Sequence, residues 1–180
     1  MAGTTAGASP AKSTPGQRGR DEVDRASAYT PRWIVPSTLL ATVAGLGVSI
    51  YLTIAHYTTT VSLACPETST INCEKVTTSP ESAVFGIPVA VLGLVYFVAM
   101  VGFNSPPAWR SQATTIRWAR LLSAVVGMGF VGWLVYSELF KVDAICLWCT
   151  SVHVINFILF CLIAIGTAAT SAVNREALAG

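Results

Sequence analysis

The sequence predicts an all-α membrane protein: a bundle of four transmembrane helices with a cysteine-bearing loop outside the membrane. Hydrophobic residues make up 53% of the 180 residues and charged residues only 11%, about half the charged share of a soluble domain. Four apolar segments each approach the roughly 20 residues that cross a bilayer as a helix. No ladder of short alternating strands is present, so the segments must be helices, which satisfy their own backbone. The length suits one compact domain.

The first 30 residues differ from the rest of the chain. They are rich in Gly, Ser, Thr, Pro and Ala and contain almost no large apolar side chains, so they cannot bury enough surface to fold. No short apolar core with a small-residue cleavage site follows a charged start, so we expect no secretory signal. We predict a disordered tail over residues 1–30, a membrane domain over 31–170 and a second tail over 171–180.

The predicted spans cover residues 33–56, 84–103, 121–140 and 145–169. Small residues in the first and third spans would let helices approach closely; they are Ala41, Ala44, Gly45, Gly47, Gly127, Gly129 and Gly132. Near the outer end of the third span, Glu138 is either solvated at the interface or a proton-holding group.

The basic residues predict the topology. Nine of the 11 Lys and Arg residues lie in the N-terminal tail, in the loop between the second and third spans or at the C-terminus; only Lys75 and Lys141 lie elsewhere. Basic residues concentrate on the cytoplasmic side of membrane proteins, so both termini are expected there. The loop 57–83 and the turn near Asp143 are then outside. The net charge of +2 is small and dispersed, which argues against nucleic-acid binding.

Four of the five cysteines fall on the outer face in this topology. Cys65 and Cys73 lie in the outer loop, and Cys146 and Cys149 lie at the outer mouth of the fourth span. This is the side on which disulfides persist. Cys161 lies within an apolar run and is expected to be inert.

Three interpretations of the four outer cysteines compete. A zinc site is disfavoured because seven residues separate Cys65 from Cys73, whereas structural zinc sites use two to four. Structural disulfides that brace the loop on a non-enzymatic membrane scaffold are a second interpretation. A redox relay is the third, because cysteines three apart in the first turn of a helix share a side and meet the positive end of its dipole. A thiolate is stabilised there and exchanges readily with a disulfide.

A relay at the membrane surface needs an electron acceptor. The sequence contains no GxGxxG or Walker pattern, and two histidines give little support for a haem or copper site. A lipid-soluble quinone that enters the bundle from the bilayer near Cys149 is the natural candidate.

The combined motifs resemble the bacterial homologues of the vitamin K epoxide reductase family. They are a Cys-x7-Cys loop, Ser79 six residues after the second cysteine, the stretch SAVFGIP leading into the second span, and CLWC opening the last span. The resemblance covers about residues 33–169. It implies a four-helix bundle around a quinone of the menaquinone or ubiquinone type, capped by the loop and a short amphipathic helix.

The resemblance also implies a function and residue roles. Bacterial members reoxidise a thioredoxin-like disulfide-forming protein outside the cytoplasmic membrane and pass the electrons to quinone. By matching position, Cys65 meets the partner, Cys73 relays to Cys146, Cys149 faces the quinone, and Ser79 lies near its ring. No thioredoxin-like domain follows the last span, so the partner is expected to be a separate chain.

Two positions depart from the animal members of the family. His153 stands where they have a tyrosine near the ring, four residues after Cys149. Val89 stands where they have a quinone-contacting asparagine. This departure puts epoxide reduction, as opposed to quinone reduction, in question. His153 shares the face of Cys149 and either donates to a quinone oxygen or bonds a backbone carbonyl.

Overall fold

The computed structural model describes residues 14, 16–17, 33–58, 63–111 and 113–179, with side chains as far as residue 170. The predicted disordered tail over residues 1–30 therefore lies outside the described residues, except for positions 14, 16 and 17.

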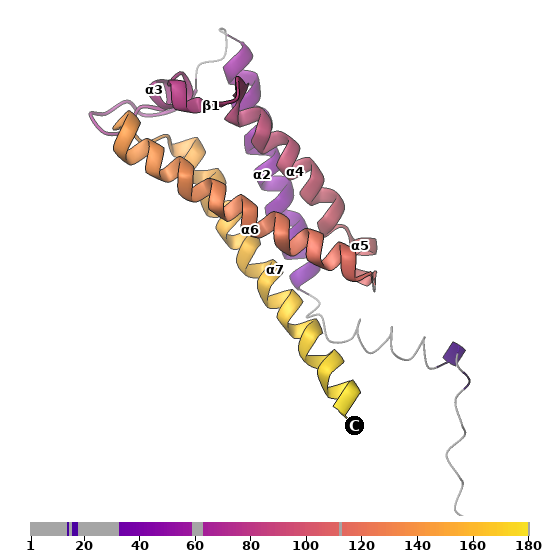
Figure 1. Cartoon of the computed structure of the whole chain (residues 1–180). Coiled ribbons are helices and arrows are strands. Elements are labelled where there is room, and N and C mark those ends of the chain that lie inside the picture. The colour runs from indigo at the N-terminus through magenta and orange to yellow at the C-terminus, as the bar shows by residue number, and fades with distance from the viewer. Residues whose placement is uncertain (1–13, 15, 18–32, 59–62, 112, 180) are drawn as a thin grey trace, which may run out of the picture.

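Four long helices make up most of the described residues, as predicted for an all-α membrane protein. Figure 1 shows α2 beside α4 and α6 beside α7, with the chain passing up and down the bundle. The helices are α2 (Ile34–Tyr57), α4 (Val89–Asn104), α6 (Thr114–Ser137) and α7 (Leu147–Ala179). By length and composition, three segments could cross a membrane: Ile34–Tyr57, Thr114–Val142 and Leu147–Thr170.

The second predicted span begins later than the sequence suggested. Residues 83–88 form a hairpin of β1 (Ala83–Val84) and β2 (Ile87–Pro88), and α4 begins only at residue 89. Phe85 and Gly86 turn the hairpin with φ of 52° and 80°, a region that a helix cannot use. The remaining 16 residues of α4 rise about 24 Å, less than the ~30 Å of a hydrocarbon core.

The third and fourth spans also have different ends. A π-helix, η2 (Glu138–Val142), extends α6, and Asp143 in the left-handed region (φ 51°) ends it. The α7 helix starts at residue 147, not 145, because Ile145 pairs with Ile71 of the cysteine-bearing loop. It continues through residues 171–179, so the structure has helix where we predicted a C-terminal tail.

The bundle packs around a buried cluster formed by Phe97, Met100, Ala124, Leu159 and Ile163. Two of the predicted small residues allow close contact here: a Cβ at Gly45 would clash with the ring of Phe97, and one at Gly127 would lie 2.7 Å from the hydroxyl of Tyr96. The prediction was wrong for Gly47, Gly129 and Gly132, which face open space.

Short helices cap the two ends of the bundle. At the loop end lie α3 (Cys73–Thr77) and the 3₁₀-helix η1 (Pro80–Ser82), and at the other end lies α5 (Pro106–Arg110). Asn72 begins α3 as an N-cap, because its side-chain oxygen accepts the backbone N–H of Lys75 at 2.8 Å. The short capping helix implied by the family resemblance is thus present as α3.

Candidate functional site

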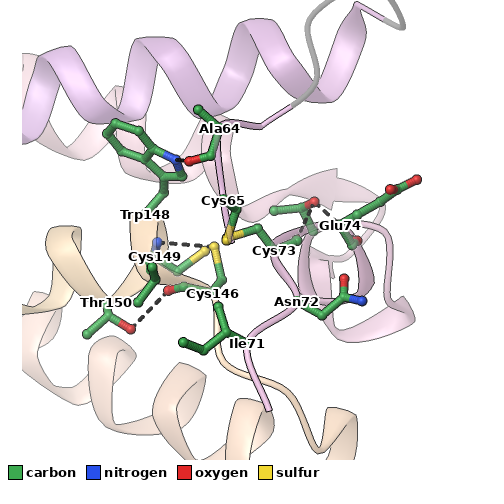
Figure 2. Close-up of a disulfide and its surroundings, with 12 residues drawn as sticks. Ala64, Cys65, Ile71, Asn72, Cys73, Glu74, Cys146, Trp148, Cys149 and Thr150 are labelled. Carbon is green, nitrogen blue, oxygen red and sulfur yellow. Dashed lines mark hydrogen bonds between the residues drawn. A yellow bond between two sulfur atoms is a disulfide. The ribbon is translucent and has the colours of Figure 1, made fainter. Parts of the chain in front are cut away.

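Cys65, Cys73, Cys146 and Cys149 lie together at the loop end of the bundle. Cys65 and Cys73 form a disulfide, with Cα atoms 6.2 Å apart, whereas Cys146 and Cys149 are free thiols. All four belong to one packed cluster with Val76, Val142 and Ala144, and Figure 2 shows the sulfur of Cys146 facing the disulfide. Cys161 belongs neither to this cluster nor to the buried cluster that contains Phe97 and Leu159.

Backbone and side-chain bonds hold the loop against the start of α7. Ile145 donates its N–H to Thr70 and accepts the N–H of Asn72 (2.9 and 3.1 Å), which brings Cys73 beside Cys146. On the other side, the indole N–H of Trp148 donates to the carbonyl of Ala64 at 3.0 Å. The disulfide is therefore fixed next to the free pair by contacts on both flanks.

Tyr51 of α2 completes this attachment. Its ring centroid lies 4.8 Å from that of Trp148, and its hydroxyl accepts the backbone N–H of Ala64 at 3.1 Å. Trp148, which lies between the two free cysteines, thus links the loop to the bundle. The spacing of the cysteines alone did not predict this role.

Cys146 lies one residue earlier than the first-turn position that the sequence suggested, at the N-cap of α7. Its carbonyl accepts the N–H of Thr150 at 2.9 Å, and its sulfur accepts the N–H of Cys149 at 3.3 Å. A thiolate there accepts an N–H that has no partner within the helix and meets the positive end of the helix dipole. The hydrogen bond from the Cys149 side chain is the main cause that lowers the pKa of Cys146, while burial and the charge of Glu138 oppose it.

A cavity of about 330 Å³ lies among the four long helices, and Cys149 and residues of η1 are part of its lining. Cavity-facing residues recur at helical spacing: Ser49, Leu52 and His56 in α2; Val89, Leu92, Gly93 and Tyr96 in α4; Gly127, Val131, Leu134 and Glu138 in α6 and η2; Cys149, Val152, His153 and Asn156 in α7. The structure thus places the three predicted quinone-contacting residues, Ser79, Val89 and His153, in one cavity with Cys149.

Few polar groups interrupt the apolar wall. The hydroxyl of Tyr96 donates to the side-chain oxygen of Asn156 at 2.8 Å, and the hydroxyl of Ser79 donates to the carbonyl of Val76 at 2.8 Å. His153 is 8% exposed and makes no hydrogen bond to any other residue that the structure describes. The backbone-bonded alternative for His153 is therefore absent from the described contacts.

Sequence reasoning missed Tyr96 and Asn156. Asn156 follows Cys149 by seven residues, two helical turns, which is a signal that the sequence contained. Tyr96 had no such signal, because only the tertiary structure brings its hydroxyl within reach of Asn156 on α7.

Glu138 was expected either at a solvated interface or as a proton-holding group, and it is only 7% exposed. Burial therefore excludes the solvated interpretation.

The zinc interpretation finds no support in the geometry. Two of its four thiols are joined in the disulfide, and the described residues include no group of three or more His, Cys, Asp or Glu side chains arranged to hold a metal ion.

The family model described as "Vitamin K epoxide reductase family" matches residues 36–164, which contain the four clustered cysteines, the capping helix and the whole cavity. A search of curated proteins found no match to the chain.

Proposed function

Because this chain belongs to the vitamin K epoxide reductase family, we propose that it oxidises dithiols outside the cytoplasm and passes their electrons to a membrane quinone. Membership in the family implies thiol-disulfide and quinone oxidoreductase activity in a membrane in general. The direction of electron flow, the partner and the order of the cysteines are our proposal.

The position of Cys149 supports this function more than any other observation. Its side chain packs against the cluster that contains the disulfide and Cys146, and it also lines the cavity. Among the described residues that line the cavity, Cys149 is the only cysteine. Electrons that leave the cysteine cluster for a molecule in the cavity would therefore pass through Cys149.

Burial of the four cysteines supports an order of transfer. Cys65 is partly exposed, while Cys73 and Cys146 are 1% and 0% exposed. A soluble thiol can reach Cys65, whereas Cys73 and Cys146 are accessible only to each other and to their neighbours. Thiol-disulfide exchange requires a thiolate to meet a sulfur directly, so we propose the order Cys65, Cys73, Cys146, Cys149.

The cavity suits the ring of a quinone. Its volume of about 330 Å³ is at the lower end of ligand pockets, and such pockets are mainly apolar with a few placed polar groups. A bound quinone would supply an acceptor of two electrons and two protons. The His153 side chain has no hydrogen-bond partner among the described residues and can donate a hydrogen bond to a quinone oxygen. The Ser79 hydroxyl already donates its hydrogen to the carbonyl of Val76, so its oxygen is left to accept a hydrogen bond from a hydroxyl of the reduced ring.

The two ends of the bundle support the proposed location. The cysteine loop lies at one end, and the beginning of α2 and the end of α7 lie at the other (Figure 1). Together with the basic residues near the second end, this favours both termini in the cytoplasm of a bacterial cell and the cysteines outside its cytoplasmic membrane. We propose that a separate thioredoxin-like protein delivers the electrons there to Cys65.

Trapping tests the order of the cysteines. In Cys73→Ala, Cys65 lacks its partner and should remain joined to the thioredoxin-like protein as a mixed disulfide, detected on a non-reducing gel and by mass spectrometry. The matched control is Cys65→Ala, which should form no adduct. Free Cys65 in the first variant, in cells that contain the partner, would overturn the order.

Quinone reduction tests the activity itself. Purified protein in nanodiscs should reduce menaquinone or ubiquinone when a reduced thioredoxin-like protein is added, measured by the change in quinone absorbance. Stable disulfides that respond to neither quinone nor the reduced partner would instead favour the scaffold interpretation.

A further inference from the structure

Glu138 occupies an unusual place for a charged side chain. It belongs to a segment that could span the membrane, yet it is 7% exposed and lines the cavity with Cys149. It follows Gly127, Val131 and Leu134 on the cavity-facing side of α6, at helical spacing. Ionisable residues within membrane spans are costly and usually functional, and π-helical turns such as η2 are often found at functional sites.

The neighbours of Glu138 are the reacting thiols. The backbone N–H of Cys146 interacts with its carboxyl group as a hydrogen-bond donor, and its charge acts on Cys146 and Cys149. The structure records no ion pair for Glu138 with a basic side chain among the residues it describes. Its carboxyl group therefore lies in the cavity wall with Cys149 and beside the backbone of Cys146, and no cation among the described residues pairs with it. The other titratable groups on the cavity wall are His56, Glu81, Tyr96 and His153.

The reaction of the dithiol must move protons as well as electrons. Oxidation of Cys146 and Cys149 forms one S–S bond, breaks two S–H bonds and releases two electrons and two protons. Reduction of a quinone to a quinol consumes the same number of each, one proton at each oxygen. Cys146 is 0% exposed and does not line the cavity, so its proton needs a carrier to reach the quinone.

We propose that Glu138 is that carrier: its carboxyl group accepts the proton of Cys146 and delivers it to a quinone oxygen in the cavity. The electron pair leaves through Cys149, whose own proton goes to the other oxygen from within the cavity, so atoms and charges balance. Glu138 thus borders the cavity and meets the backbone of Cys146, whose thiol does not line that cavity. This inference depends on the proposed function, because it assumes a quinone as acceptor.

The kinetic test compares Glu138→Gln with wild-type protein in nanodiscs. Prereduced protein is mixed with quinone and a single turnover is followed by absorbance. Loss of a positioned acid–base group should slow the step about 100-fold in Glu138→Gln. Glu138→Asp keeps a carboxyl group on a shorter side chain and should react about tenfold faster than Glu138→Gln. Glu74→Gln, on the exposed side of α3, is the matched control and should react at the wild-type rate.

A second measurement needs no quinone. Titration of the Cys146 thiolate by its ultraviolet absorbance should shift to lower pH in Glu138→Gln, because the carboxylate charge that opposes this thiolate is gone. Exchange of Cys65 and Cys73 with a reduced thioredoxin-like protein should stay at the wild-type rate, which shows that the variant is folded.

The outcomes separate the two proposals. Wild-type protein that reduces no quinone would refute the proposed function, and with it the proton-carrier role. Active wild-type protein together with a Glu138→Gln variant that turns over within about twofold of it, across the pH range, would overturn the role of Glu138 alone.

Discussion

The two ends of the bundle are built by different means. At the loop end, a disulfide, a backbone bridge and the Trp148 hydrogen bond hold together small and sulfur-containing side chains beside a cavity. Further along the bundle, large side chains such as Met100, Leu159 and Ile163, which do not line the cavity, are completely buried.

This difference separates stability from chemistry. Exchange of a disulfide requires sulfur atoms to move and partners to enter, which tight packing would prevent. The loop end is therefore held by a few specific bonds that leave space, while interlocked side chains at the other end stabilise the fold. Substitutions in the two regions should have separable effects.

The largest effect on chemistry is expected for Cys149→Ala. Removal of the sulfur between the cysteine cluster and the cavity should reduce quinone reduction to background, because no other described cysteine lines the cavity. Stability should hardly change, since Cys149 is only partly buried. Steady-state quinone reduction and thermal unfolding in detergent measure the two quantities.

Cys161→Ala is the matched control for that variant. It removes a thiol from the same helix outside both packed clusters and should be nearly silent in both assays. A strong loss of activity in Cys161→Ala would contradict the separation of the two regions.

The largest effect on stability is expected for Leu159→Ala in the packed cluster. Leu159 is 0% exposed, and truncation of such a residue typically costs about 2 to 5 kcal/mol through lost contacts and the cavity left behind. Protein that remains folded at low temperature should still reduce quinone at a near-normal rate. An intact unfolding temperature would show that this cluster does not stabilise the bundle.

A smaller effect is expected for the pH dependence of Cys146. Its lowered pKa means that the thiolate persists to more acidic pH than an ordinary thiol. In Cys149→Ala the main cause of that shift is lost, so the thiolate should appear only at higher pH, with a change of about tenfold in thiolate fraction at neutral pH. An ultraviolet absorbance titration measures this, and an unchanged midpoint would refute the hydrogen bond as its cause.

The smallest effect is expected for Trp148→Phe. The substitution keeps an aromatic ring against Tyr51 but removes the bond to Ala64, which is worth about 1 kcal/mol. Hydrogen exchange of the loop should increase while global stability falls by no more than that amount. Trp118→Phe, at an exposed position on α6, is the control and should change neither.

The sequence contained most of the fold. Composition and four apolar segments predicted an all-α membrane bundle, and they succeeded because a bilayer admits few other solutions. The ends of the segments were less predictable. The start of α4 depends on a hairpin around Phe85 and Gly86, and the start of α7 depends on the pairing of Ile145 with Ile71. Strand pairing of this kind cannot be predicted from hydropathy or from helical spacing.

The candidate site shows the same division. The sequence by itself determined the spacing within each cysteine pair and the helical turn that places His153 on the side of Cys149, because each of these depends on neighbours along one chain segment. Only the tertiary structure decided that Tyr96 meets Asn156 and that Glu138 is buried in the wall of the cavity that Cys149 lines. Those contacts join helices far apart in the sequence, and their geometry is set by how the side chains of four helices pack.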